Sequence, residues 1–252
     1  MKRLLILGGT GDAVRLASLA IDLPGLAVIT SLAGRTIAPK ALAGAVRIGG
    51  FGGEVSLVEY LQTENIDLLI DATHPFAARI SGNAAGAATR VGIPRLMLIR
   101  PGWVRSDLDD WIEVESVEAA VGAIPTRVER IFLTIGRQQL APFASLADKW
   151  CLMRSIDPPD PIIPLPPGEL LLDRGPFSLE QELQLLRDYR IQAIVSKNSG
   201  GDATYAKIIA ARELGLPVIM VQRSIVPEGD RVGDVLGAMK WLRERNSNLM
   251  RS

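Results

Sequence analysis

The stretch that decides the fold is Lys2-Arg3-Leu4-Leu5-Ile6-Leu7-Gly8-Gly9-Thr10-Gly11-Asp12. Its apolar first part predicts a buried strand, and apolar positions spaced from Val14 to Ala20 predict a helix directly after it. Glycine lets the backbone turn tightly and lets a ligand approach closely, while the N–H groups at a helix N-terminus attract anions. The stretch therefore predicts the first strand-turn-helix unit of a nucleotide-binding α/β fold.

This glycine turn matches the dinucleotide-binding pattern Gly-x-Gly-x-x-Gly at two of its three glycines. Gly9 and Gly11 occupy the first two positions, whereas Val14 occupies the third. The third glycine serves the packing of helix on strand, so its absence weakens the match without removing the phosphate site. A strand-turn-helix unit that binds no ligand remains the alternative explanation.

Composition and charge exclude several classes of protein. The chain has 252 residues, 48% of them hydrophobic, and its 28 basic residues balance its 28 acidic ones, which argues against bulk binding of nucleic acid. One cysteine and one histidine exclude an internal disulfide and cysteine-rich or histidine-cluster metal sites, so no metal is expected. Cys151 lies in an apolar stretch and is expected to be a buried, inert thiol. Without a membrane-span or signal-peptide pattern, we expect a cytoplasmic protein.

Apolar strands alternate with helical patterns along the whole chain, which predicts parallel sheets covered by helices on both faces. After the first strand, the expected strands span residues 26–31, 46–48, 66–71, 94–99, 130–135, 150–154, 169–173, 192–196 and 217–221. The expected helices include residues 55–64, 77–91, 179–190, 204–214 and 232–245, and Ser178 opens one of them with a capping box.

Two segments of the sequence echo one another. Residues 88–100 and 211–223 each read as a helix that ends at a glycine, a proline that starts a strand, and an arginine that ends it. A helix that ends at a glycine and a strand that starts at a proline are common in α/β proteins, but two similar halves of the chain are the simplest explanation of the echo. We expect two α/β domains, residues 1–105 and 106–252, with a last helix that either stays in the second domain or packs back on the first.

Ligands of parallel sheets bind beyond the carboxyl ends of the strands, so residues there are the candidates for chemistry. Ser31 and Arg35 follow the second strand, and no acid lies between Asp22 and Glu54. An acid would repel a phosphate on the cofactor ribose, whereas an arginine and a hydroxyl would hold it, so NADP(H) is favoured over NAD(H). A solvated surface arginine remains the alternative for Arg35.

Three further strand ends carry residues suited to ligand binding or proton transfer. Residues 49–53 contain four glycines, which favours a backbone that passes close to a ligand over a flexible linker. His74 is a candidate general acid, although a lone histidine is more often structural. Lys197 is a candidate to hold an anion or donate a proton, with a surface charge as its alternative. The sequence lacks Tyr-x-x-x-Lys, Gly-x-Ser-x-Gly and P-loop motifs.

At these motifs the chain resembles the precorrin-6A reductase family, NADPH-dependent enzymes of cobalamin biosynthesis, together with their cobalt-precorrin-6A counterparts. The matching stretches are residues 7–12, 31–35, 49–53, 71–77 and 196–201. The resemblance spans nearly the whole chain, and the histidine and Lys-Asn-Ser-Gly-Gly blocks are its most specific parts. The poorest match is the proline-rich stretch around residue 160.

The resemblance implies two Rossmann-like domains with a cleft between them. It further implies hydride transfer from NADPH to a ring double bond of a tetrapyrrole, with a proton from His74, Lys197 or a water that they hold. The residues implied to meet NADPH are Gly9, Thr10, Gly11, Asp12, Ser31, Arg35, Gly52 and Gly53. The residues implied to meet the carboxylate-rich substrate are Phe76, Arg79, Arg137, Lys197, Asn198, Ser199 and Gly200, with Arg223 as a further candidate cation.

Two other functions compete with this enzyme. A sensor that binds NADPH without turning anything over would leave the His74 and Lys197 strand ends unexplained. A dehydrogenase for a different small molecule would have a smaller and less cationic binding region.

Overall fold

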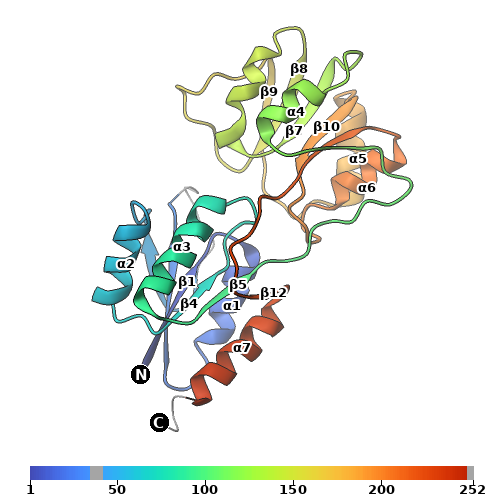
Figure 1. Cartoon of the computed structure of the whole chain (residues 1–252). Coiled ribbons are helices and arrows are strands. Elements are labelled where there is room, and N and C mark those ends of the chain that lie inside the picture. Colours follow the sequence, from blue (N-terminus) through green and yellow to red (C-terminus); the bar gives the residue numbers. More distant parts are fainter. Residues whose placement is uncertain (35–41, 249–252) are drawn as a thin grey trace. The chain divides into compact units, whose positions relative to one another are not determined.

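The computed structural model describes residues 1–34 and 42–248. The chain forms two compact units (Figure 1). The first consists of Met1–Pro101 together with the segment from Ile225 onward, and the second of Gly102–Ser224. Each unit is built on a six-stranded sheet in which every strand pair is parallel, as the alternation of apolar strands and helices predicted.

The sheet of the first unit has the order β3-β2-β1-β4-β5-β12. This is the doubly wound order 3-2-1-4-5-6, with β12 as the sixth strand. Its strands are β1 (Lys2–Leu7), β2 (Leu26–Leu32), β3 (Ala45–Ile48), β4 (Leu68–Asp71), β5 (Arg95–Leu98) and β12 (Asp230–Val232). Its helices are α1 (Gly11–Ala20), α2 (Glu54–Thr63), α3 (Ala78–Val91) and α7 (Val235–Asn248).

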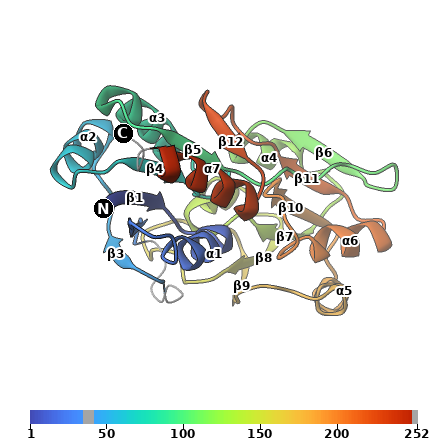
Figure 2. The ribbon, with the colours of Figure 1, turned by 90° about the horizontal axis from the view of Figure 1, so that it is seen from below.

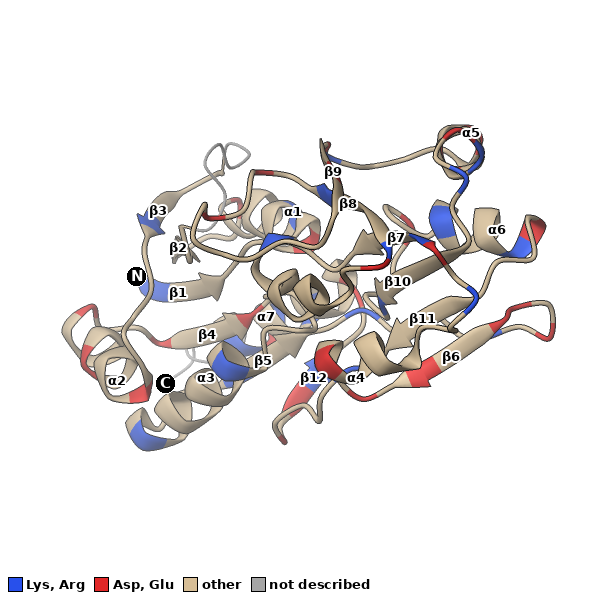
Figure 3. Ribbon diagram, turned by 90° about the horizontal axis from the view of Figure 1, so that it is seen from above, with Lys and Arg blue, Asp and Glu red and all other residues tan. Residues whose placement is uncertain are grey.

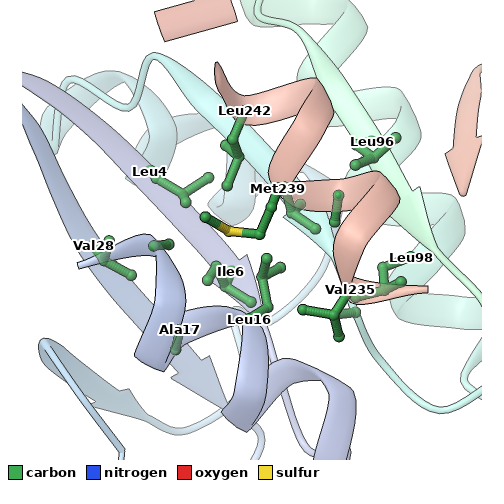
Figure 4. Close-up of a cluster of buried hydrophobic side chains, with 14 of the residues drawn as sticks. Leu4, Ile6, Leu16, Ala17, Val28, Leu96, Leu98, Val235, Met239 and Leu242 are labelled. Carbon is green, nitrogen blue, oxygen red and sulfur yellow. The ribbon is translucent and has the colours of Figure 1, made fainter. Parts of the chain in front are cut away.

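The last four residues of β1, Leu4 to Leu7, are all apolar and buried because both faces of the sheet are covered there. Leu4 and Ile6 face a core shared with α1 and α7, whereas Leu5 and Leu7 face a second core shared with α2 and α3. Figure 4 shows the first of these cores, in which β1, α1 and α7 contribute neighbouring side chains. The carboxyl ends of β1, β2 and β4 therefore meet at one edge of a sheet held rigidly on both sides.

The second unit has the order β9-β8-β7-β10-β11-β6. Its strands are β6 (Trp111–Val114), β7 (Arg130–Thr134), β8 (Trp150–Ser155), β9 (Gly168–Leu172), β10 (Ala193–Lys197) and β11 (Val218–Val221). Its helices are α4 (Val117–Ala123), α5 (Leu179–Asp188), α6 (Ala206–Glu213) and the 3₁₀ segments Arg137–Gln139 and Ala141–Ser145. Figure 2 shows α4 on the side of this sheet opposite to α5 and α6.

The sixth strand of each sheet comes from a segment that follows the fifth strand of the other sheet. After β5 the chain forms β6, which pairs with β11 in the second unit. After β11 it forms β12, which pairs with β5 in the first unit. The two halves of the chain thus exchange their sixth strands, and the chain passes between the units twice.

This exchange corrects the expected division at residues 105 and 106. The segment from Ile225 onward belongs to the first unit, because β12 pairs with β5 and α7 packs on α1 (Figure 1). The position of α7 agrees with the alternative expectation, in which the last helix packs back on the first domain. The second unit begins earlier than expected, at Gly102, where Trp103 hydrogen-bonds with Asn198.

Two strands and one α-helix were not expected from the sequence. The edge strand β6 and the short helix α4 lie in a stretch without a clear apolar period, and β12 consists of Asp230, Arg231 and Val232. The last helix was expected to begin at residue 232 and begins instead at Val235, because β12 occupies the residues before it. Within the described part of the chain, no helix combines the length and hydropathy needed to cross a bilayer. No group of three or more metal-ligating side chains occurs there either.

Leu242 tests the role of α7 in the first unit. Its side chain is fully buried in the core with α1 and β1, so we expect Leu242→Ala to lower the free energy of unfolding by about 2–5 kcal/mol. Leu236→Ala, on the same helix but 69% exposed, is the matched control and should change it by less than about 0.5 kcal/mol. Urea unfolding followed by tryptophan fluorescence measures both. Equal effects of the two substitutions would show that α7 does not complete this core.

Candidate functional site

The glycine turn after β1 is held in place by Thr10. The Thr10 hydroxyl accepts the backbone N–H of Ala13 at 3.1 Å and so caps α1, and it donates to the carbonyl of Ala72 at 2.8 Å. The second bond ties the turn to the end of β4. Because the Thr10 hydroxyl is used within the protein, the turn has only backbone N–H groups to offer an anion.

The glycines of this turn border open space. Gly9 has φ +114°, which favours glycine for backbone reasons. A Cβ added at Gly9 or Gly11 would meet no described atom within 4 Å, whereas one at Gly8 would lie 3.0 Å from the Thr30 side chain. Gly8 therefore serves the packing of β1 on β2, while Gly11 leaves room beside the start of α1 for a ligand.

Asp12 lies in the first turn of α1 and is paired with a cation. Its carboxylate is 3.1 Å from Nη1 of Arg100, which follows β5. A carboxylate is favourable at a helix N-terminus, but it would repel a phosphate bound there. The Arg100 guanidinium offsets that repulsion, so the expected cofactor contact of Asp12 comes with a partner that the sequence did not reveal.

The end of β2 carries Ser31 beside an arginine that sequence reasoning missed. Nη1 of Arg47, on β3, lies 3.3 Å from the Ser31 hydroxyl oxygen. The same guanidinium donates to the carbonyls of Gly49 and Gly50 and lies 3.9 Å from the centroid of the Phe51 ring. Arg47 thus fastens the glycine run to the sheet and puts a positive charge at this edge. Arg35, the cation expected here, lies outside the described residues.

The glycine run after β3 needs its glycines for two reasons. Gly52 and Gly53 have φ of +87° and +135°, and Gly53 is the N-cap of α2. A Cβ at Gly49, Gly50 or Gly53 would meet no described atom within 4 Å. The run therefore combines a special backbone with open space, as a close ligand approach requires.

The loop after β4 is organised by a buried carboxylate. Asp71 is 1% exposed, and its Oδ1 accepts from the Thr73 N–H at 3.1 Å and from the Thr73 hydroxyl at 2.7 Å. His74 follows, and its Nδ1 accepts the Phe76 N–H at 3.3 Å. With Nδ1 as an acceptor, a neutral His74 ring carries its proton on Nε2. Arg79 is exposed on the first turn of α3.

In the second unit, the segment after β10 is held by hydrogen bonds with residues from both ends of the unit. Asn198 accepts the Trp103 N–H at 2.7 Å and donates to the Trp103 carbonyl at 3.1 Å. Arg223 donates to the carbonyls of Asn198 and Ser199 at 2.7 and 2.8 Å. Arg223, considered from sequence as a substrate cation, therefore holds the backbone of this loop. Lys197 is half-buried at the end of β10.

The structure brings the expected residues to two strand edges, one in each unit. The carboxyl edge of the first sheet carries Gly9 to Asp12, Ser31, Gly52 and Gly53, and the loop of His74 and Phe76. The carboxyl edge of the second sheet carries Arg137, which donates to the Pro158 carbonyl at 2.6 Å, and residues 197–200.

Burial raises the pKa of Cys151 to about 12, which fits the inert thiol expected from sequence.

The strand order, the glycine turn after β1 and the open space beside it at the carboxyl ends of the strands define a Rossmann-type α/β protein. The chain contains two α/β units with parallel sheets. The family model "Precorrin-6x reductase CbiJ/CobK" matches residues 3–243. The chain belongs to this family of reductases.

Two relatives and a solved structure match over nearly their whole length, and a third relative matches over most of it. The precorrin-6A reductase of Rhodococcus erythropolis is 48% identical over 96% of this chain and 98% of its own. That of Rhodobacter capsulatus is 43% identical over 98% of both chains. A solved structure titled "CobK precorrin-6A reductase" covers 97% of both chains with a TM-score of 0.90 and 44% identity. The cobalt-precorrin-6A reductase of Methanothermobacter thermautotrophicus is 31% identical over 90% of this chain and 79% of its own.

The capping role of Thr10 can be measured through stability. Thr10→Ala removes the acceptor for the Ala13 N–H and the bond to Ala72, so we expect a loss of about 1–2 kcal/mol in the free energy of unfolding. Thr10→Ser keeps the hydroxyl and should lose much less. Urea unfolding compares the two, and equal losses would mean that the hydroxyl bonds do not hold the turn.

Proposed function

We propose that the protein is an NADPH-dependent precorrin-6A reductase of cobalamin biosynthesis. The observation that carries the proposal is the full-length similarity to several proteins of that name, at 43–49% identity for the first three. Proteins named cobalt-precorrin-6A reductase are 27–31% identical. This difference supports the metal-free substrate over the cobalt-containing one.

The carboxyl edge of the first sheet fits a dinucleotide. The N–H groups at the start of α1 face the open space beside Gly9 and Gly11, which suits a diphosphate. Ser31, with Arg47 beside it and Arg35 four residues on, is suited to a ribose phosphate. Gly52 and Gly53 are assigned to the backbone that passes beside the cofactor. NADPH, when bound, supplies the hydride.

The carboxyl edge of the second sheet suits a substrate with many carboxylates. Arg137 and Lys197 supply positive charge there, and Asn198, Ser199 and Gly200 form the adjoining loop. Acidic residues lie along β6 and its flanking segments (Figure 3), and Asp157, Asp160 and Asp173 follow β8 and β9 at the same edge as Arg137. In the first unit, Phe76 and Arg79 are assigned to the same substrate.

The proton that accompanies the hydride is assigned to His74 or Lys197, or to a water that they hold. The hydrogen bond from the Phe76 N–H occupies Nδ1, so Nε2 is the His74 atom that can bind the substrate or hold a water. An imidazole titrates near neutral pH, and an ammonium is a proton donor throughout the physiological range. The Phe76 N–H orients the His74 ring, whereas Lys197 also offers a positive charge to the carboxylates of the substrate.

The direct test is cofactor titration followed by turnover with precorrin-6A. A reductase oxidises NADPH only when the tetrapyrrole is present, and it binds NADPH more tightly than NADH. Binding of NADPH without turnover would support a sensor instead. Turnover with an unrelated small molecule would support a different dehydrogenase.

Cofactor choice is tested by Ser31→Asp. An acid at this position repels a ribose phosphate and bonds a ribose hydroxyl, so we expect NADPH affinity to fall about tenfold or more relative to NADH affinity. Fluorescence titration with both cofactors measures the ratio, and Ser31→Ala is the matched control without added charge. An unchanged ratio in Ser31→Asp would contradict a phosphate beside Ser31.

Proton donation is tested by His74→Ala and Lys197→Ala. Loss of a general acid typically costs about 10²–10⁴-fold in rate, so one of the two variants should lose kcat on that scale with cofactor affinity retained. Single-turnover oxidation of bound NADPH, followed by absorbance, measures the chemical step. Full turnover by both variants would rule out both residues as proton donors.

A further inference from the structure

The second unit buries a group of three charged side chains that are not themselves among the proposed substrate residues. Arg154 on β8, Glu182 on α5 and Lys207 on α6 are 9%, 1% and 4% exposed. Arg154 Nη2 lies 2.7 Å from Glu182 Oε1, and the Arg154 guanidinium lies 3.7 Å from the centroid of the Phe177 ring. This cluster, Arg154–Glu182–Lys207, contains two basic side chains and one acidic side chain.

Of the three residues in the cluster, Lys207 is the one whose burial in the charged form destabilises the fold most. Glu182 is already paired with Arg154, so a charged Lys207 adds a buried positive charge without a carboxylate of its own. Burial and the neighbouring Arg154 lower the pKa of Lys207 to about 7, and Glu182 opposes them only in part. A methionine would fill similar space without that cost. Fold stability alone therefore does not explain a lysine at this position.

What Lys207 contacts is the segment of residues 198–204, which follows β10. Its Nζ donates to the carbonyl of Thr204 at 3.0 Å and lies 5.1 Å from the centroid of the Trp103 ring. Trp103 in turn donates from Nε1 to the carbonyl of Gly201 at 2.8 Å and pairs through its backbone with Asn198. Lys207 thus contacts the end of the segment directly and its middle, at Gly201, through the indole.

We propose that Lys207 is a positioning residue that holds residues 198–204 in their substrate-binding conformation at a cost in fold stability. The proposal rests on the proposed function in one respect, that these residues bind the carboxylates of the tetrapyrrole. A charged ammonium makes a stronger hydrogen bond to Thr204 and a cation–π contact with Trp103 that a neutral amine or methionine lacks.

The experiment compares Lys207→Met with the wild type. We expect the KM for precorrin-6A to rise about tenfold, equivalent to about 1.4 kcal/mol, while the dissociation constant for NADPH is unchanged. Hydrogen exchange of the 198–204 amides should be faster than in the wild type. Lys240→Met, which removes an exposed lysine on α7, is the control and should change none of these.

The same substitution is expected to raise the melting temperature, although it is expected to weaken substrate binding. The folded-state pKa of Lys207 lies below its unfolded value of 10.5, so the wild type gains stability as pH rises from about 7 toward 10.5. Lys207→Met should therefore melt higher than the wild type at pH 6–7, by a margin that shrinks as pH rises. Arg154 and Glu182 are the charged groups facing Lys207 from β8 and α5.

A wild-type measurement covers the case in which Lys207→Met does not fold. Protection factors for the 198–204 amides should fall as pH rises through 7, because Lys207 then loses its charge. Unchanged KM and unchanged exchange in Lys207→Met, or pH-independent protection in the wild type, would overturn the proposal. A wild type that does not reduce precorrin-6A would overturn the proposed function instead, and the exchange data would still decide the role of Lys207.

Discussion

The pairing of β12 with β5 and of β6 with β11 is the constraint on which the rest of the structure depends. Each pairing completes a six-stranded sheet with a strand that follows the fifth strand of the other unit. In the first unit it also brings α7 onto α1, where Met239 and Leu242 cover Leu4 and Ile6 (Figure 4). The face of the first sheet that supports the glycine turn is therefore built from both ends of the chain.

Because every strand is parallel, all loops that follow strands in a unit gather at one edge of its sheet. In the first unit this edge is shaped by backbone more than by side chains. The Thr10 hydroxyl, the Arg47 guanidinium and Asp71 Oδ1 all make hydrogen bonds within this edge, and what remains beside Gly11 and Gly53 is open space bordered by N–H groups. Rigid loops and small residues together suit the edge to a long ligand that lies along it.

The sequence predicted the central strands well because each is apolar on both faces, and it predicted the glycine turn and the loops after β4 and β10 from their position. It did not predict β6 and β12, since β12 has only three residues, two of them charged, and β6 has four residues with Glu113 among them. Arg100 and Trp103 were missed because their roles depend on neighbours distant in sequence, and Arg47 because its contact with Ser31 depends on the register of β3 on β2. The structural role of Arg223 was missed for the same reason, since only the fold shows that its guanidinium meets the carbonyls of Asn198 and Ser199.

The exchanged strands also determine the order in which the protein can be completed during synthesis on the ribosome. All six strands of the second unit lie between Trp111 and Val221, so that sheet is whole before residue 230 has been translated. The first sheet has five strands by Leu98 but receives its sixth only when Asp230–Val232 emerges. The unit whose residues are made first is therefore the last to be finished, and its partly covered apolar face must wait for α7.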